Sequence, residues 1–262
     1  MLLSWLRKRR RRRIASRPFP ERWRDYLHHN VAHYRFLSEA EQAKLRDDLR
    51  IFIAEKNWEG CGGLIMTDEI RVTIAAMASL LVLGMKHNYF DRVKSVLVYP
   101  STYVAADSPW HGTGIIDEAG EARLGEAWYR GPVVLAWDEA RTDGRLRHHG
   151  QNVVFHEFAH QLDMLDGVIN GTPPLKSEEE AQRWHDVMTR EYQRLIRSAE
   201  SGRATLLDTY GATNEGEFFA VATECFFERP LAMSERHPEL YELLRDYYQQ
   251  DPAKRCASRP AS

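Results

Sequence analysis

The sequence predicts an α+β fold in which helices pack around a small mixed sheet. Helical patterns with clear start signals occupy the first and final thirds of the chain, so the N-terminal part is expected to be helical. Short β-branched and aromatic runs occupy the middle third. The 262 residues are 43% hydrophobic, which is enough to bury a substantial core within one large domain.

Two helices are expected in the first third. Residues 37–58 begin at a capping box formed by Ser38 and Glu41 and continue with an apolar stripe. After a glycine-rich break at Gly60–Gly63, a second helix is expected from about Thr67 to Leu83. Because it is nearly all apolar after its first turn, this second helix should lie in the centre of the core.

Four runs in the middle third are expected to be strands, because Gly, Pro and Asp separate them. They are Ser95–Pro100, Thr113–Ile116, Ala122–Tyr129 and Pro132–Trp137. Residues 117–120, DEAG, are typical of a hairpin turn between the second and the third run. Helices are expected again in the final third, in the segments 153–167, 177–199, 215–228 and 237–250. The second of them starts at a capping box formed by Ser177 and Glu180.

The N-terminus is strongly basic. Residues 1–17 carry eight Lys or Arg side chains, seven of them consecutive from Arg7 to Arg13, and no acid. Since the whole chain has a net charge of −2, the remainder is acidic. We expect residues 1–20 to form a basic, disordered tail and residues 21–262 to form one domain. The alternative is that the basic run binds anionic lipid or nucleic acid, and on a membrane surface Leu2, Leu3, Trp5 and Leu6 would enter the lipid. Direct nucleic-acid binding is not expected.

The sequence favours a cytoplasmic protein. At the N-terminus the apolar residues precede the basic run, which is the reverse of a secretory signal. The longest apolar run, Ile74–Met85, is too short to span a bilayer. The three cysteines are odd in number, widely scattered and without a CxxC pair. That pattern argues against a disulfide framework or a thiolate metal site, and for a reducing compartment.

Residues 153–167, VVFHEFAHQLDMLDG, contain the pattern H-E-x-x-H. In a helix, His156 and His160 project from one face about one turn apart, so their imidazoles can bind one zinc ion. Glu157 lies about 100° around the helix from His156. From there its side chain can reach a water on the metal as a general base. The alternative is two ordinary histidines on a buried helix, since so short a pattern also arises by chance.

A catalytic zinc needs a third protein ligand. No third histidine follows the motif closely, so the ligand is expected to be a carboxylate from another segment. The candidates lie between residues 215 and 228 and are Glu215, Glu217, Glu224 and Glu228. Glu217 and Glu224 share one helical face, and flanking phenylalanines should bury this helix. A buried carboxylate needs a positive partner such as zinc. Spacing alone does not choose between Glu215 and Glu217.

Several blocks occur together in one order: HEFAHQLD, then Tyr210, EFFAV from Glu217 and ECFF from Glu224. LSEAEQAKL, VLVYPSTYV, GPVVLAW and YYQQDP extend the set, from about residue 35 to 254. In these blocks the chain resembles the bacterial Mlc titration factor A family of zinc peptidases. The long basic run departs from the family pattern.

The resemblance implies one Zn²⁺ ion per chain, held by His156, His160 and Glu217. It also implies that Glu157 is the catalytic base and that Tyr210 steadies the transition state. The implied fold is a zincin-like metallopeptidase core, similar to the gluzincins and notably to anthrax lethal factor.

The activity that the resemblance implies is that of an aminopeptidase on peptide substrates. The implied partner is an Mlc-like transcription repressor of glucose uptake, whose binding regulates a sugar phosphotransferase system. The alternative is a regulatory protein that sequesters the repressor and whose zinc site is mainly structural.

Three further expectations concern the surroundings of the site. Asp163 and Glu224 are candidates for holding the imidazole N–H groups of the two histidines, although Asp163 could simply terminate its helix. The run Ala122–Tyr129 is expected to be an edge strand that binds an extended peptide by strand addition.

Overall fold

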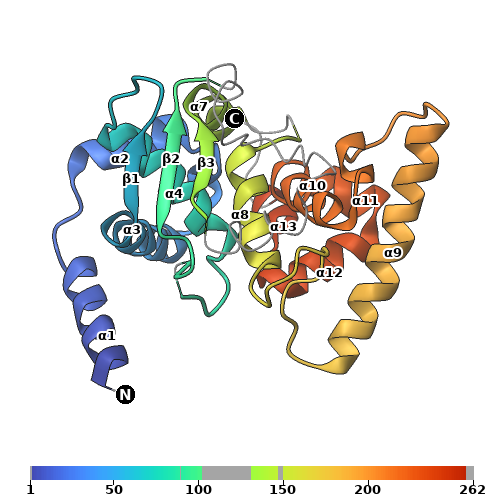
Figure 1. The fold of residues 1–262 in the computed structure, drawn as a ribbon, viewed down its shortest axis with the longest axis horizontal. Helices are drawn as coiled ribbons and strands as arrows, with labels where there is room; N and C mark the ends of the chain where they lie inside the picture. Colours follow the sequence, from blue (N-terminus) through green and yellow to red (C-terminus); the bar gives the residue numbers. More distant parts are fainter. Residues whose placement is uncertain (1, 89, 102–130, 147–149, 258–262) are drawn as a thin grey trace. The chain divides into compact units, whose positions relative to one another are not determined.

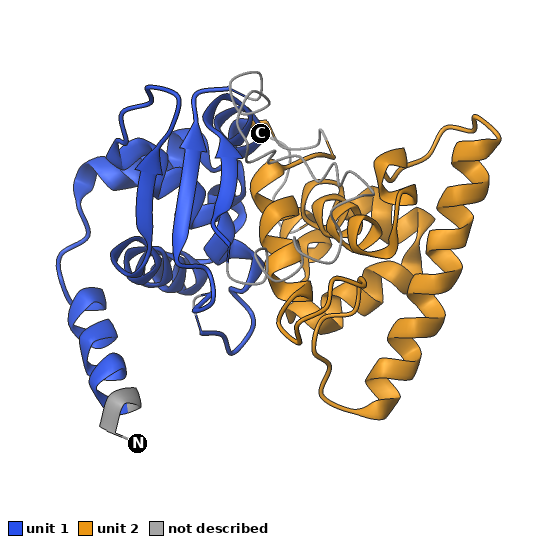
Figure 2. Cartoon of the chain, viewed as in Figure 1, with its two compact units in different colours: residues 1–145 blue, residues 146–262 orange. Residues whose placement is uncertain are grey.

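The computed structural model describes residues 2–88, 90–101, 131–146 and 150–257. The chain divides into two compact units, residues 1–145 and residues 146–262 (Figure 2). Helices dominate both units, and a small parallel sheet lies in the first (Figure 1). The predicted α+β fold is therefore confirmed. The single domain expected over residues 21–262 stays a prediction, and each unit is described by itself.

Unit 1 contains a three-stranded parallel sheet in the order β1-β2-β3. Val96 of β2 pairs with Trp58 of β1 on one side and with Val133 of β3 on the other. The strands are β1 (Asn57–Gly60), β2 (Ser95–Tyr99) and β3 (Val133–Ala136). Strands β2 and β3 correspond to two of the four predicted runs. The other two runs, at residues 113–116 and 122–129, and the turn at 117–120 lie outside the described residues, so the mixed character of the sheet stays a prediction.

Helix α4 (Asp68–Leu81) forms the centre of unit 1. Thr67 caps it, because its Oγ1 accepts a hydrogen bond from the N–H of Ile70 at 3.3 Å. Every residue from Val72 to Leu81 is buried. The helix also supplies the crossover that two parallel strands require, since it lies between β1 and β2 in the chain. The predicted central helix is confirmed.

Helix α3 (Glu39–Glu55) begins at the predicted capping box. The N–H of Glu41 donates to Ser38 Oγ, and the N–H of Ser38 donates back to Glu41 Oε2. The helix is shorter than the sequence pattern indicates, because it stops at Glu55 and Asn57–Gly60 pairs with β2 instead. Pairing with a strand distant in sequence overrides the local helical pattern there.

The N-terminal residues differ from the predicted disordered tail, because Leu2–Ala15 forms helix α1. Arg11 is buried and pairs with Glu55 and Asp91, with N–O distances of 2.6 Å in both cases. These ion pairs hold α1 against the rest of unit 1. Composition does not reveal them, because the acidic partners lie 44 and 80 residues further along the chain.

Unit 2 is built around helix α10 (Glu215–Glu228), in which every residue after Glu215 is buried. Helix α8 (Val153–Asp163) packs against it (Figure 1). The short 3-10 helix η2 (Thr209–Ala212) also contacts α10. The rings of Phe226 in α10 and Tyr248 stack with their centroids 5.7 Å apart. Buried aromatic side chains therefore fix the position of α10 within unit 2.

Helix α9 (Glu178–Glu200) starts at Ser177, whose Oγ accepts a hydrogen bond from the N–H of Glu180 as predicted. In a capping box the side chain of Glu180 would accept a hydrogen bond from the N–H of the N-cap residue, Ser177. Here Glu180 Oε2 accepts instead from the N–H of Lys176, the residue before the N-cap. The remaining helices are α2 (Glu21–Asn30), η1 (Ala32–Phe36), α7 (Trp137–Arg145), α11 (Pro230–Arg236), α12 (Pro238–Tyr248) and α13 (Pro252–Ala257). Within the described ranges, no helix combines the length and the apolar character needed to cross a bilayer.

Candidate metal centre

Helix α8 presents the two motif histidines. Asn152 caps the helix, and its Oδ1 accepts a hydrogen bond from the N–H of Phe155 at 3.1 Å. Phe158 and other apolar side chains bury the opposite face. His156 and His160 are half-buried, and their ring centroids are 4.8 Å apart. The packed apolar face thus holds both imidazoles on one side of a rigid helix.

Helix α10 presents Glu217 from its first turn. Asn214 caps the helix, and its Oδ1 accepts a hydrogen bond from the N–H of Glu217 at 2.9 Å. The carboxylate lies near the N-terminus of the helix, where the positive end of the helix dipole stabilises a negative charge. Only 5% of Glu217 is exposed, whereas Glu215 is exposed at the start of the helix.

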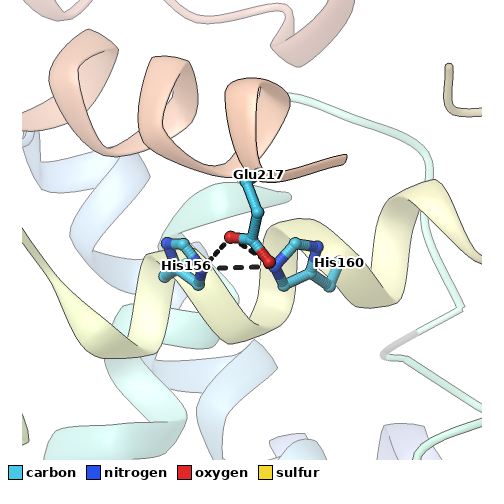
Figure 3. Close-up of side chains that lie close together, drawn as sticks. All are labelled: His156, His160 and Glu217. Atoms are coloured by element: carbon cyan, nitrogen blue, oxygen red, sulfur yellow. Dashed lines mark hydrogen bonds and ion pairs between the residues drawn. The ribbon is translucent and has the colours of Figure 1, made fainter. Parts of the chain in front are cut away.

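Three ligand atoms from α8 and α10 converge (Figure 3). Oε2 of Glu217 lies 3.0 Å from Nε2 of His156 and 3.5 Å from Nε2 of His160. The two Nε2 atoms are 3.2 Å apart. Oε2 of Glu217 is buried and has no hydrogen-bond partner among the described residues. The structure therefore brings together the two histidines and the carboxylate that the family resemblance implies.

The residues present fit a divalent metal ion. Two ligand atoms that each lie 2.0–2.1 Å from a tetrahedral zinc ion are about 3.3 Å apart. The three observed separations, 3.0, 3.2 and 3.5 Å, surround that value. A buried carboxylate oxygen without a hydrogen bond is costly, and a cation among the three atoms would remove that cost. Two imidazoles and one carboxylate also match the three-ligand set of catalytic zinc.

The charges around the three atoms favour a cation. Burial raises the pKa of Glu217, but the two neighbouring imidazoles outweigh it and lower that pKa to about 2. Burial lowers the pKa of His156, whereas Glu217 and Glu224 raise it, to about 10. Without a bound metal ion, the carboxylates therefore keep a proton on His156 at neutral pH. A metal ion would take the place of that positive charge.

Glu224 orients His156. It lies two turns after Glu217 on the same helix, and its Oε1 is 2.7 Å from Nδ1 of His156. A carboxylate accepts hydrogen bonds, so Nδ1 donates its hydrogen to Glu224, and Nε2, which faces Glu217, is the nitrogen left to bind a metal ion when the ring is neutral. The second oxygen of Glu224 accepts a hydrogen bond from the N–H of Asn152. Glu224 thus holds an imidazole N–H, as the sequence predicts.

Asp163 takes the other of its two predicted roles. It is the last residue of α8, and its Oδ2 accepts a hydrogen bond from the N–H of Gly171 at 2.8 Å. Neither its Oδ1 nor the Nδ1 of His160 has a hydrogen-bond partner within the described part of the chain. Asp163 therefore ends the helix and anchors the loop that follows, and it does not hold an imidazole in this structure.

Tyr210 lies in η2 with its ring centroid 6.0 Å from that of His156, and 38% of the residue is exposed. Asp208 begins η2 by accepting a hydrogen bond from the N–H of Tyr210 at 2.9 Å. Burial, followed by Glu217 and Glu157, raises the pKa of Tyr210 to about 12. The hydroxyl therefore keeps its proton at neutral pH and can donate a hydrogen bond.

Glu157 follows His156 on α8 and is half-buried. Its pKa is raised, because burial and the negative charges of Glu217 and Glu224 outweigh the two imidazoles. These interactions place its carboxyl group within the electrostatic reach of the three ligand atoms. A raised pKa makes the Glu157 carboxylate a stronger proton acceptor than an ordinary glutamate, which is the property that a general base needs.

The profile of the glucose-regulated metallopeptidase M90 family matches residues 5–249, which is most of the chain. The chain belongs to the M90 family. The family is one of metallopeptidases, and His156, His160 and Glu217 of unit 2 form a group that could hold a metal ion.

Individual relatives agree with this family assignment. The chain is 38% identical over 255 residues to the uncharacterised protein slr2042 of Synechocystis sp., covering 97% of this chain and 91% of that protein. It is 30% identical over 261 residues to the Mlc titration factor A proteins of Yersinia pestis and Yersinia pseudotuberculosis, covering 97% of this chain and 92% of each of those proteins. The resemblance found in the sequence blocks is confirmed along nearly the whole chain.

Sequence reasoning missed the residues that set the ends of these elements. Asn152 and Asn214 cap the two helices of the M90 site, and Asp208 caps η2. A signal was present, because Asn or Asp directly before an apolar helical pattern is a typical N-cap. The further role of Asn152, whose N–H donates to Glu224, depends on a residue 72 positions away and has no local signal.

Proposed function

We propose that this M90 protein is a zinc-dependent peptidase whose metal ligands are His156, His160 and Glu217. The observation that carries the proposal is the convergence of three ligand atoms at 3.0–3.5 Å around a buried carboxylate oxygen that lacks a hydrogen bond. Bound zinc supplies Lewis acidity, which lowers the pKa of a water molecule to about 7 and polarises a peptide carbonyl.

The protein's own groups would move the protons. Glu157 takes a proton from the attacking water and passes it to the leaving amine, which suits a carboxyl group whose pKa is raised by burial. The Tyr210 hydroxyl, protonated at neutral pH, donates a hydrogen bond to the oxygen that becomes negative in the transition state. Glu224 keeps His156 in the tautomer that presents Nε2.

The experiment that tests the metal site compares Glu217→Ala with Glu215→Ala. The two residues lie in the first turn of α10, but Glu217 is buried against the histidines while Glu215 is exposed. We expect purified wild-type protein and Glu215→Ala to contain one zinc ion per chain by elemental analysis, and Glu217→Ala to contain almost none. Equal zinc content in both variants would end the proposal.

The experiment that tests the chemistry uses Glu157→Gln, which keeps the three ligands but removes the base. Peptide hydrolysis should fall by at least about a hundredfold while zinc content stays at the wild-type level. Unchanged hydrolysis would show that Glu157 is not the base.

Aminopeptidase-type cleavage is the finer part of the proposal and rests on the family resemblance. It predicts cleavage of peptides with a free N-terminal amine and no cleavage of the same peptides after acetylation. Equal cleavage of both forms, or cuts at internal bonds, would replace it with endopeptidase activity. We also place the protein in the cytoplasm, which the three widely scattered cysteines of the sequence, with no CxxC pair among them, support.

A second function is proposed because the Yersinia relatives carry the name Mlc titration factor A. We infer that the chain binds an Mlc-like transcription repressor and thereby regulates a sugar phosphotransferase system. Glu157→Gln separates the two functions, because repressor binding should survive the loss of the base. If purified repressor from the same organism binds neither the wild type nor the variant, the regulatory function is excluded and the peptidase proposal is unaffected.

A further inference from the structure

One face of helix α1 packs against the rest of unit 1. Arg11 is buried and pairs with Glu55 and Asp91, and Arg7, one turn earlier, pairs with Asp91 at 2.6 Å. Residues four apart lie on the same side of a helix, so Arg7 and Arg11 define its inward face. Because these ion pairs fix the rotation of the helix, they also fix which side chains point away from unit 1.

The outward face carries arginines that have no acidic partner. At 100° per residue, Arg9 and Arg13 lie about 160° around the helix from Arg11. Both are exposed, as is Arg12 beside them. Among the described residues, none of these three makes an ion pair, in contrast to Arg7 and Arg11. Residues 1–17 contain no acid, so no neighbouring negative charge on α1 reduces this positive field.

Two large apolar side chains share that outward half of the helix. Trp5 is 57% exposed and Leu6 is 47% exposed. They lie about 120° and 140° around the helix from the buried Arg11. The guanidinium of Arg9 lies 5.4 Å from the centre of the Trp5 ring. The face therefore places an indole and an aliphatic side chain at the N-terminal end and three unpaired cations next to them.

We propose that the outward face of α1 docks on the surface of a membrane containing anionic lipids. Arg9, Arg12 and Arg13 contact lipid phosphates and carboxylates, while Trp5 and Leu6 enter the interfacial layer, where indole rings are favoured. A nucleic acid would also attract the arginines, but its phosphate backbone leaves Leu6 exposed to water. The exposed apolar pair on the same face therefore favours a lipid surface.

The charge of the remaining chain limits how the protein binds. Outside residues 1–17 the chain is acidic, so an anionic surface attracts α1 and repels most of the rest of the protein. Two exposed apolar side chains and a few cations give weak, reversible binding that salt disrupts. Docking through α1 is thus peripheral, and it needs no membrane-spanning segment.

The test uses the full chain with vesicles of phosphatidylcholine mixed with phosphatidylserine, and with vesicles of phosphatidylcholine alone. We expect co-sedimentation with the mixed vesicles, little with the neutral ones, and release by added salt. Arg9→Gln, Arg12→Gln and Arg13→Gln combined should weaken binding to the mixed vesicles by roughly a hundredfold. The matched control combines Arg183→Gln, Arg190→Gln and Arg203→Gln, three exposed arginines of unit 2 with the same change in net charge.

A second pair of variants tests the apolar contribution. Trp5→Ser with Leu6→Ser should weaken vesicle binding, whereas Ile65→Ser, at a residue that is 82% exposed elsewhere in unit 1, should not. Absence of wild-type binding to the anionic vesicles would overturn the proposal, as would an equal loss in the unit 2 control. The proposal would also be overturned, in favour of a nucleic acid, if the wild type bound duplex DNA or RNA tightly but did not bind vesicles, and if the variant with Trp5→Ser and Leu6→Ser bound the nucleic acid equally well. Thermal unfolding of each variant checks that it is folded.

Discussion

Nδ1 of His156 lies 2.7 Å from Oε1 of Glu224, on the same helix that carries Glu217. Helix α10 therefore contributes in two ways to the first motif histidine. One carboxylate faces its Nε2 and the other holds its Nδ1, seven residues apart along one helical face. The position of helix α10 thus determines both the third ligand, Glu217, and the tautomer of the first ligand, His156.

Replacing Glu224 by Ala should weaken metal binding. Loss of the carboxylate frees the ring of His156 to rotate and to change tautomer. Removing a hydrogen-bond partner of a metal ligand typically lowers metal affinity by about 10–100-fold. Competition with a chromophoric chelator measures the affinity. Glu224→Gln, whose amide oxygen can still accept the hydrogen bond, should recover part of it. Wild-type affinity in the alanine variant would show that the contact does not orient His156.

Replacing Tyr210 by Phe should lower kcat for peptide hydrolysis and leave zinc content unchanged. The hydroxyl is proposed to stabilise charge that develops in the transition state, a contribution of roughly 3–4 kcal/mol, or about 10²–10³ in rate. Tyr192→Phe is the control, since the Tyr192 hydroxyl donates to the carbonyl of Ala212 at 3.3 Å, at the end of η2. An equal loss in both variants would indicate that η2 had shifted and that the hydroxyl has no direct role.

Gly171→Ala should destabilise unit 2 more than Gly202→Ala does. Both glycines have positive φ, +70° and +65°, so an alanine at either position costs about 1–2 kcal/mol. At Gly171 the added carbon would also lie 2.4 Å from the carbonyl oxygen of Glu215, whereas nothing lies within 4 Å at Gly202. Urea unfolding measures both free energies. If both variants lost the same free energy of unfolding, the loop at Gly171 would have moved away from α10 without a further loss of stability.

Asp48 in α3 should make stability depend on pH. Burial raises its pKa, but hydrogen bonds with His87 and Lys44 outweigh burial and lower the pKa below its ordinary value of 3.8. A lowered folded pKa gives stability that is present above the unfolded pKa and is lost as pH falls through the folded pKa.

Asp48→Asn tests this dependence. The variant should lose about 1–3 kcal/mol in free energy of unfolding at about pH 7, because a buried charged hydrogen bond is removed. The difference from wild type should shrink at about pH 3. A difference that stays constant between the two pH values would contradict the role of the Asp48 charge. Glu39→Gln, at an exposed position of the same helix, is the control for a general change of charge.

Features encoded by neighbouring residues could be predicted from the sequence. The capping box of α3, the buried helix α4 and the helical H-E-x-x-H motif all depend on residues within a few turns of one another. Helix capping and apolar periodicity act over the same short distance, so the sequence pattern and the folded structure agree there. The spacing of His156 and His160 was determined in this way.

Features that depend on distant partners could not be predicted in the same way. Helix α3 ends at Glu55 because β1 pairs with β2 directly after it. Helix α1 is held in place by the ion pairs of Arg11 with residues at least 44 positions away. The sequence alone predicts a helix that continues to residue 58 and a disordered N-terminal tail, because local propensity and composition contain no information about such partners.

By itself, the sequence determined an α+β protein with two imidazoles one helical turn apart and several acids further along the chain. Residue spacing left Glu215 and Glu217 equal, and the family resemblance favoured Glu217. The packing of α10 against α8 placed Oε2 of Glu217 between the two imidazoles and left Glu215 exposed. The physical reason is that helical periodicity orients residues on their own helix, whereas the contact between two helices depends on how the whole core of unit 2 packs.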